Sequence, residues 1–214
     1  MLSSRRLAIK HISVDFPIDR LDDLVWSGAS QTAVTKYWSG KAAPDGRQFS
    51  AKLLWSDMAL YIRFDASQRE PLVISDKPDL TAKTVGLWDR DVCEIFVAPD
   101  KCNRGKYFEF EIAPTGEWVD LKIEFASHEW KTDLAYASGL TSAARIDNGK
   151  IVMAIKIPWE AFGARPRVGD VWLGNLFRCV GQGDTRGYLA WQPTKTPQPN
   201  FHVPEKFGEF RFIQ

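Results

Sequence analysis

Short segments with apolar side chains at every second position recur along the chain. Side chains alternate between the two faces of a strand, so this period predicts β-strands, and no helical period is sustained. We expect strands over residues 7–14, 49–55, 60–65, 92–97, 107–112, 118–125, 142–146, 151–157, 171–180, 188–192 and 208–213. The first of these is predicted to be an edge strand. Residues 1–214 are predicted to form one all-β domain, an antiparallel β-sandwich of jelly-roll type with about ten strands.

Turn residues indicate how these strands are connected. Asn148-Gly149 is the strongest hairpin signal of the chain. Residues 158–163 have Pro early and Gly at the end, which predicts one helical turn. A second helical turn is expected at 21–26, with Trp26 filling a core. The polar segment 66–87 is predicted to be a long loop that leads to Trp88.

The segment from Trp88 to Phe96 combines an aromatic side chain with a carboxylate on a strand. Cys93, Ile95 and Val97 are expected to share one face of the strand, and Val92, Glu94 and Phe96 the other. A loop would place Trp88 at the rim of the sheet, with Glu94 behind it. A ring that stacks on a pyranose and a carboxylate that accepts from its hydroxyls would suit sugar recognition. The alternative is that Trp88 caps a core and Glu94 pairs with a Lys or Arg.

Composition narrows the class of partner. The formal net charge of +1 gives no attraction to nucleic acid or to an anionic membrane. Nine Trp and thirteen Phe exceed what a sandwich core usually requires, and exposed rings often mark binding surfaces. The three cysteines have no paired spacing, so a disulfide framework is not expected. Cys93 and Cys179 are expected to be buried and inward-facing, and Cys102 to lie in a loop.

Five motifs in order make the chain similar to the family 9 carbohydrate-binding modules. The resemblance extends over about residues 16–213. It includes Trp88, Asp91, Glu94, Ile95 and Phe96. The other matches are Ile18-Asp19 with Asp22 and Trp26, Leu54 to Ile62, Ile157-Pro158-Trp159, and Pro204 to Gly208 with Phe210. The resemblance implies a β-sandwich that binds a mono- or oligosaccharide without cleaving it, in association with a glycoside hydrolase.

The resemblance also implies where the ligand would bind. A second aromatic side chain, Phe201 here, would face Trp88 across the sugar, and Gln198 and Asn200 precede it in the same loop. Glu94, Glu109 or Glu111, and Arg178 are expected to form a charged floor by strand alternation. The family usually has Arg where Glu111 stands, and Arg178 is a candidate to replace that charge. A structural cross-strand ion pair is the alternative.

Paired carboxylates raise the question of glycoside hydrolysis, with Asp91 and Glu94 or Glu94 and Glu111 as candidates. Arg178 beside them would keep both groups ionised and leave no proton donor. We therefore expect no catalytic residue. A structural β-sandwich without a ligand is the remaining alternative.

The resemblance implies a calcium site and a cellular location that the residues themselves do not specify. Family members bind structural calcium, and four aspartates are candidate ligands here: Asp57, Asp65, Asp76 and Asp79. No calcium ligand can be assigned from spacing. Residues 1–12 lack an apolar signal region, and no segment is apolar enough to span a membrane. The sequence alone indicates the cytoplasm, whereas the resemblance implies an extracellular or periplasmic location.

Overall fold

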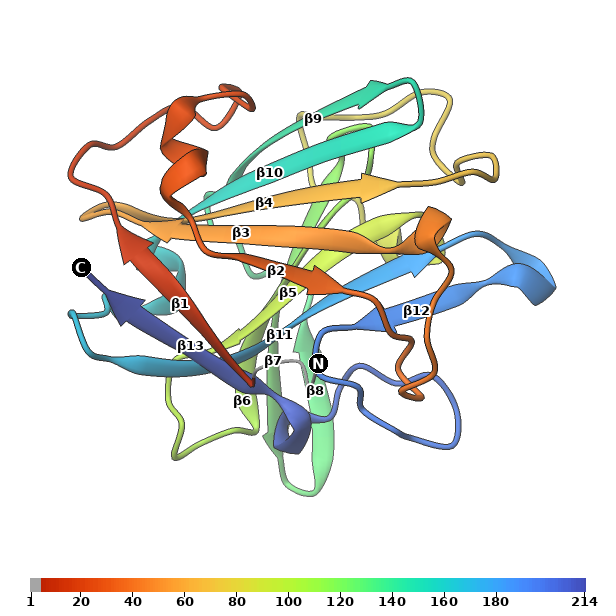
Figure 1. Ribbon diagram of the computed structural model, residues 1–214. Helices are drawn as coiled ribbons and strands as arrows, with labels where there is room; N and C mark the ends of the chain where they lie inside the picture. Colours follow the sequence, from red (N-terminus) through yellow and green to blue (C-terminus); the bar gives the residue numbers. More distant parts are fainter. Residues whose placement is uncertain (1–4) are drawn as a thin grey trace.

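Residues 5–214 are described by a computed structural model. Residues 1–4, part of the segment inspected for a targeting signal, lie outside the described residues. The described chain is all-β, with thirteen strands and six short 3-10 helices (Figure 1). In this range no helix is long and apolar enough to cross a bilayer.

The thirteen strands of the described chain form one curled, mixed sheet. The strands are β1 (Arg6–His11), β2 (Gln31–Val34), β3 (Phe49–Trp55), β4 (Ala59–Ser67), β5 (Val92–Ala98), β6 (Lys106–Ile112), β7 (Trp118–Ala126), β8 (Glu129–Asp133), β9 (Thr141–Asp147), β10 (Lys150–Pro158), β11 (Val171–Val180), β12 (Gly187–Ala190) and β13 (Gly208–Ile213). Their order is β8-β7-β6-β5-β11-β13-β1-β3-β4-β10-β9, with β12 on β11 and β2 on β3. The prediction of an all-β fold is confirmed, and the strand count was too low.

The sheet folds back on itself through β1 and β13, so that its two halves form two layers (Figure 1). β1 pairs in parallel with both β13 and β3. The predictions of a purely antiparallel sheet and of an edge strand at 7–14 were therefore wrong. Alternation shows which side chains of a strand share a face, but it does not show which strand lies beside it.

The main core lies between the two layers. It contains Ile62 of β4, Ile95 of β5 and Leu176 of β11, all fully buried. The outer face of the β1-β3-β4-β10-β9 layer is covered by the segment after β1. There Phe16 packs against Trp26 and Tyr61. The expected core role of Trp26 is confirmed, because it is only 2% exposed.

A second apolar cluster covers the outer face of the other layer. It is built from side chains of β5, β6, β7 and β11, with Phe201 and Phe207 from the segment before β13. Phe96, at its centre, stacks on Tyr107 and meets Phe177 edge-on. Because this cluster lies outside the main core, it positions the candidate site between a sheet face and a loop.

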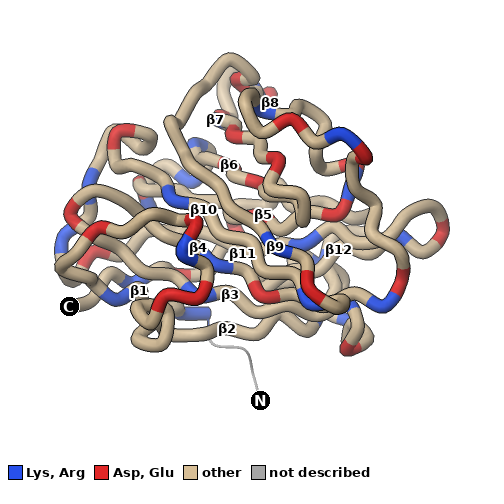
Figure 2. Tube along the Cα trace, turned by 90° about the horizontal axis from the view of Figure 1, so that it is seen from above, with Lys and Arg blue, Asp and Glu red and all other residues tan. Residues whose placement is uncertain are grey.

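Local predictions were accurate where turn chemistry is strong. Asn148 and Gly149, both with positive φ, close the β9–β10 hairpin. The helical turn expected at 158–163 appears as the 3-10 helix Trp159–Phe162, whereas the one expected at 21–26 begins later, as the 3-10 helix Leu24–Gly28. Strands β2 and β8 were missed. All five residues of β8 are exposed, so no buried alternation marks it. Charged residues of both signs are interspersed over the molecule, as the near-neutral net charge indicates (Figure 2).

Candidate functional site

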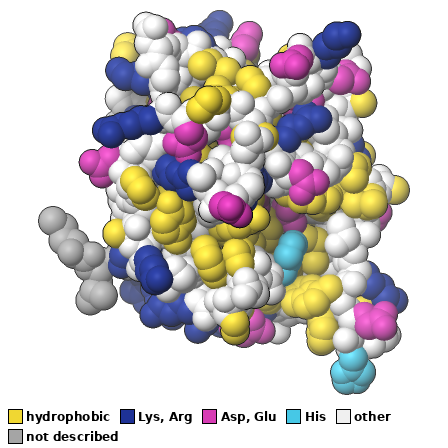
Figure 3. Space-filling view, turned by 90° about the vertical axis from the view of Figure 1, so that its right-hand side faces the viewer, with side chains coloured by type: hydrophobic (Ala, Val, Ile, Leu, Met, Phe, Trp, Pro, Cys, Tyr) yellow, Lys and Arg dark blue, Asp and Glu magenta, His cyan; other side chains and the backbone are white. Residues whose placement is uncertain are grey.

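A cavity of about 360 Å³ lies on the outer face of β5, β6 and β11. Its lining contains carboxylates, aromatic rings and one histidine: Trp88, Asp89, Glu94, Phe96, Glu109, Leu121, Thr132, Cys179, Tyr188, Pro199, Asn200, Phe201 and His202. Figure 3 shows hydrophobic side chains gathered on one face of the molecule, with acidic side chains and a histidine beside them. The mixture offers both a stacking surface and hydrogen-bonding groups.

Trp88 lies at the edge of this cavity, in the 3-10 helix Leu87–Asp89 just before β5. Gly86 precedes it with a φ of 86°, a conformation that glycine adopts without strain. Leu87 is fully buried and anchors the turn, whereas Trp88 is 37% exposed. Within residues 5–214 no aromatic ring stacks on the indole of Trp88. The structure thus presents this ring to solvent instead of using it to cap a core.

Phe201 also lines the cavity. Its ring stacks on Phe177 with centroids 4.0 Å apart and planes 13° apart, and it meets Tyr188 edge-on at 6.0 Å. Phe201 is only 9% exposed, so most of its surface already has a protein partner. Tyr188 is half-buried and also lines the cavity. Phe201 therefore presents only a small part of its ring to the cavity, and Tyr188 presents more.

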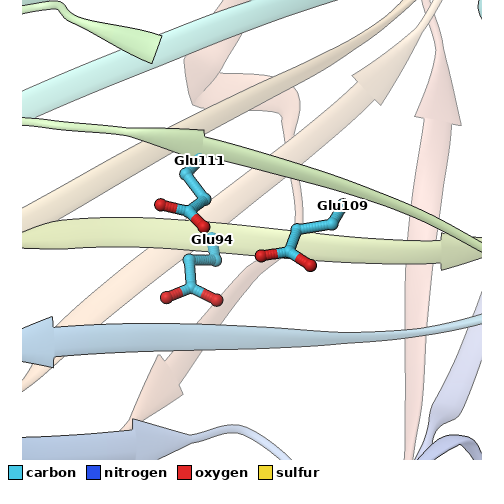
Figure 4. A group of neighbouring side chains, drawn as sticks. All are labelled: Glu94, Glu109 and Glu111. Atoms are coloured by element: carbon cyan, nitrogen blue, oxygen red, sulfur yellow. The ribbon is translucent and has the colours of Figure 1, made fainter. Parts of the chain in front are cut away.

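Three glutamates form a cluster beneath the cavity. Glu94 of β5 is directly opposite Glu111 of β6, and Glu109 lies two residues before Glu111 on the same face. One carboxylate oxygen of each lies within 4.8 Å of the others. Figure 4 shows the three side chains converging from the two strands. Glu94 and Glu109 line the cavity, whereas Glu111 is 0% exposed and lies behind them.

Burial raises the pKa of each carboxyl group in this cluster. It raises the pKa of Glu109 to about 7. For Glu94 and Glu111 burial is the largest cause, and the negative charges of the neighbouring glutamates raise the pKa further. No Lys, Arg or His of residues 5–214 forms an ion pair with any of the three. The cluster is therefore a concentration of carboxyl groups without a direct ion-pair partner, although the positive charge of Arg186 lowers the pKa of Glu94 to some extent.

Arg178 is not part of this site, and its predicted place beside Glu94 was wrong. It pairs with Cys93 across β5 and β11, so it points into the main core. Its guanidinium donates to the backbone oxygens of Arg47 and Ser67 at 2.8 and 2.9 Å, and to Gln68 Oε1 at 2.7 Å. The alternation rule had correctly grouped Arg178 with its neighbours on β11, but that face is the buried one.

The cysteines lie on different faces of the sheet. Cys93 and Cys179 are both buried, as predicted, but only Cys93 faces the main core. The Cys179 thiol donates to Glu94 Oε1 at 3.3 Å on the cavity side. Burial raises the pKa of the Cys93 thiol to about 12 and also raises that of Cys179. Cys102 is exposed, as expected for a loop residue.

The remaining predicted ligand residues are separated by the structure. Asn200 lines the cavity, and its side-chain oxygen accepts from the His202 backbone N–H at 2.9 Å. Gln198 is exposed and does not line the cavity. Sequence reasoning missed Tyr188 and His202. His202 Nδ1 is 2.8 Å from the Tyr107 hydroxyl, and its nearness to Phe201 in the sequence was the one available signal.

The four aspartates considered for calcium are not brought together. Asp57 pairs with Arg165 and His11, and Asp65 with Arg63. Asp79 accepts from the Thr81 hydroxyl. Among residues 5–214, the group of three side chains that could hold a metal ion is Glu94, Glu109 and Glu111. None of the four aspartates, Asp76 included, belongs to such a group in the described residues, so their side chains do not form a shared calcium site.

Comparisons with known proteins agree with the fold and the motifs. A family model described as "Carbohydrate family 9 binding domain-like" matches residues 18–214. A solved structure of a Bacteroides uniformis protein is 15% identical, with a TM-score of 0.76 over 97% of this chain and 98% of that one. No curated protein gives a significant match.

Two further similar structures are of a carbohydrate-binding module of family 9 from Caldicellulosiruptor kristjanssonii. One, in complex with cellotriose, has a TM-score of 0.69 and covers 97% of this chain and 93% of that chain. The other, with glucose, has a TM-score of 0.66 and covers 97% and 95%. Each is 14% identical, so the likeness establishes the fold alone.

Proposed function

Because the chain belongs to the carbohydrate family 9 binding domain-like family, a family of non-catalytic sugar-binding domains, we propose that it binds a mono- or oligosaccharide in the cavity beside Trp88. Trp88 stacks on one face of the sugar, and Phe201 with Tyr188 lines the other side. Glu94, Glu109 and Asn200 bond to hydroxyls below. Glu111 supports this floor from behind, Gln198 lies too far along the loop to line it, and Arg178 has a structural role instead.

The exposed Trp88 ring at the edge of an acid-lined cavity is the observation that carries this proposal. The Trp88 side chain is 37% exposed, so part of its apolar surface is free to contact a ligand, and such rings are enriched at binding sites. Carboxyl oxygens beneath it can accept hydrogen bonds from paired hydroxyls. A structural domain without a ligand would not require either feature.

The carboxyl cluster is arranged for binding and not for hydrolysis. Glycosidases place two carboxyl groups on either side of one bond, about 5 Å apart or roughly 6.5–9.5 Å apart. Glu94, Glu109 and Glu111 all project from the same face of two neighbouring strands, so they reach a ligand from one side. The sequence argument that Arg178 removes the proton donor was wrong, because Arg178 faces the core. The argument against hydrolysis now depends on the positions of the three glutamates, which all project from one face of the sheet.

Calorimetric titration tests the function directly. Glucose and cellotriose, the sugars bound in the two Caldicellulosiruptor structures, are the first ligands to use, followed by xylose- and mannose-based oligosaccharides. We expect saturable binding of at least one of them, with one sugar per chain. Absence of binding to every sugar tested would favour a structural domain. Incubation with aryl glycosides should give no turnover, and turnover lost in Glu94→Gln would indicate an enzyme.

We further propose that the chain works beside a glycoside hydrolase, since a binding domain without catalytic groups aids hydrolysis by holding the enzyme at its substrate. The check is the rate of polysaccharide hydrolysis by a hydrolase fused to this chain. The matched control is the same fusion carrying Trp88→Ala. Equal rates for the two fusions would contradict this role.

A further inference from the structure

Three carboxyl groups are buried close together at the floor of the cavity, and sugar binding alone does not explain why. Glu94, Glu109 and Glu111 are 2%, 4% and 0% exposed, and their carboxyl groups converge (Figure 4). Moving an ionised carboxylate out of water is unfavourable unless a partner of opposite charge is present. Three such groups in one place multiply this cost through mutual repulsion.

The polar atoms of the cluster also lack hydrogen-bond donors. With all three groups ionised, neither oxygen of Glu111 has a hydrogen-bond donor in residues 5–214, and the same holds for Glu109 Oε2. The alternative to a bound partner is a proton shared between Glu109 and Glu111, which would join these two carboxyl groups in a hydrogen bond. Glu94 Oε1 accepts only the weak donor of the Cys179 thiol, at 3.3 Å. Buried oxygens without partners are rare in folded proteins and call for an unseen group. One carboxylate oxygen of each glutamate lies within 4.8 Å of the others, so a group that contacts all three would lie among these oxygens.

The neighbouring cations are already committed to other acceptors. Arg186 is the cation whose charge acts on Glu94, yet its guanidinium donates to the backbone oxygens of Gly181, Trp88 and Arg90. Arg90 pairs with Glu117 at 3.1 Å. No Lys, Arg or His of the described residues forms an ion pair with the three glutamates, so Arg186 compensates their charge only in part and from a distance.

We propose that Glu94, Glu109 and Glu111 hold a divalent cation of the hard, oxygen-preferring class, with Ca²⁺ as its representative. Carboxylate oxygens are the ligands that Ca²⁺ prefers, and about six to eight of them surround it. Three glutamates supply between three and six oxygens, depending on whether each binds through one oxygen or both. Oxygens converging within 4.8 Å of one another can all contact a single ion at the 2.3–2.6 Å typical of calcium.

The cation would also contribute to sugar recognition, and this step rests on the proposed function. Glu94 and Glu109 line the cavity, so an ion between them faces it. Coordination positions that the three glutamates leave unfilled open toward the ligand, where two neighbouring hydroxyls of a sugar can occupy them. Trp88 at the edge of the same cavity would then stack on the coordinated ring.

Calorimetry with CaCl₂ alone tests the cation site without any sugar. The protein is first freed of metal with EDTA and returned to a chelator-free buffer near pH 7.5. We expect one Ca²⁺ per chain for the wild type and a loss of affinity of at least about tenfold in Glu111→Gln, because the charge of the ligand set governs calcium affinity. Glu124→Gln, which removes an exposed carboxylate of β7, is the matched control and should bind like the wild type.

Two results would overturn the site. One is the absence of stoichiometric Ca²⁺ binding to the wild type, which would mean that shared protons neutralise the cluster. The other is equal binding by wild type and Glu111→Gln, which would place the ion elsewhere. Glu94→Gln provides a second variant, so the test stands if one of them fails to fold by circular dichroism.

The role of the ion in recognition needs a separate measurement. The sugar identified by calorimetry is titrated into the protein twice, once in buffer with Ca²⁺ and once in buffer with EDTA. A fall in sugar affinity of about tenfold or more in EDTA supports coordination of the hydroxyls, whereas equal affinity overturns it and leaves the cation structural. Since Ca²⁺ binding is measured without sugar, failure of the sugar-binding proposal and failure of the cation site are distinguishable.

Discussion

At the scale of single residues, the site depends on a few side chains whose surroundings differ sharply. Trp88 is exposed at the cavity edge, Phe201 is packed against Phe177, and Glu111 is fully buried. Exposure, and not residue type, separates the groups that can contact a ligand from those that position them. The following predictions use that difference.

Replacing Trp88 with Ala should remove sugar binding while leaving the fold intact. The indole contributes stacking area to the ligand but little to the core, because it is 37% exposed and has no ring partner in the described chain. We expect a loss of roughly 2 kcal/mol or more in binding free energy, typical of a central aromatic contact, and a small change in melting temperature. A large drop in melting temperature with unchanged affinity would assign Trp88 to the core.

The three cysteines should react very differently with a thiol reagent. Burial raises the pKa of Cys93 to about 12 and raises that of Cys179, so both remain protonated and inaccessible at pH 8. Cys102 is exposed. Mass spectrometry after brief treatment with iodoacetamide should show one modified site in the native protein and three in urea. Native Cys102→Ser should show none, and modification of Cys179 in the folded protein would indicate that the cavity floor opens.

At the scale of elements, the site is assembled by strands that alternate faces and by a loop that closes over them. β5 and β6 supply the carboxyl groups, β11 supplies Cys179, and the segment before β13 supplies Phe201. β8 adds Thr132 to the lining. Trp130, two residues earlier on β8, lies on the same face and meets the Tyr107 ring at 5.7 Å.

Trp130→Ala should weaken binding of an oligosaccharide more than binding of a monosaccharide. Trp130 is 44% exposed and does not line the cavity itself, so we expect it to contact a second sugar unit instead of the first. We expect an affinity loss of about 1 kcal/mol for the longer ligand, within the range of exposed aromatic contacts, and no measurable loss for the single sugar. Titration of both ligands against the variant checks this, and equal losses would place Trp130 at the primary site or in the fold.

At the scale of the whole molecule, a buried arginine forms hydrogen bonds between the two layers. The Arg178 side chain, on β11, donates to the backbone oxygens of Arg47 and Ser67 in the other layer. Arg47 lies just before β3, and Ser67 is the last residue of β4. Gln68 continues the connection to Asp91 at 2.7 Å, and Asp91 accepts from the Gly181 backbone N–H at 2.7 Å. Through Asp91, this network connects the segment that leads into β5 with both layers.

Arg178→Met should destabilise the protein strongly without a direct effect on the ligand. The variant leaves buried oxygens without donors, and losing such a buried charged donor costs about 3–5 kcal/mol. Chemical denaturation should show this loss as a lower midpoint. Arg145→Met, which breaks the exposed pair with Asp22, is the control and should lower the midpoint far less, because exposed ion pairs contribute little to stability. If Arg178→Met lowered the affinity for the sugar without lowering stability, Arg178 would belong to the binding site.

The sequence by itself determined the strands, their two faces and the segment around which the site is built. Alternation correctly placed Cys93, Ile95 and Val97 in the core and Glu94 on the opposite face. These features are local: a period of two residues or a turn signal such as Asn148-Gly149 is encoded within a few positions.

Only the tertiary structure decided which of two faces meets the other layer and which meets the cavity. Arg178 was assigned to a polar face, because a charged residue is usually solvated, but its partners come from residues 47–68, far away in the sequence. The parallel pairing of β1, the packing of Phe201 on Phe177 and the convergence of Glu94, Glu109 and Glu111 are likewise contacts between distant segments. Residue type and spacing constrain what each strand can present, whereas burial and charge depend on what the folded chain brings against it.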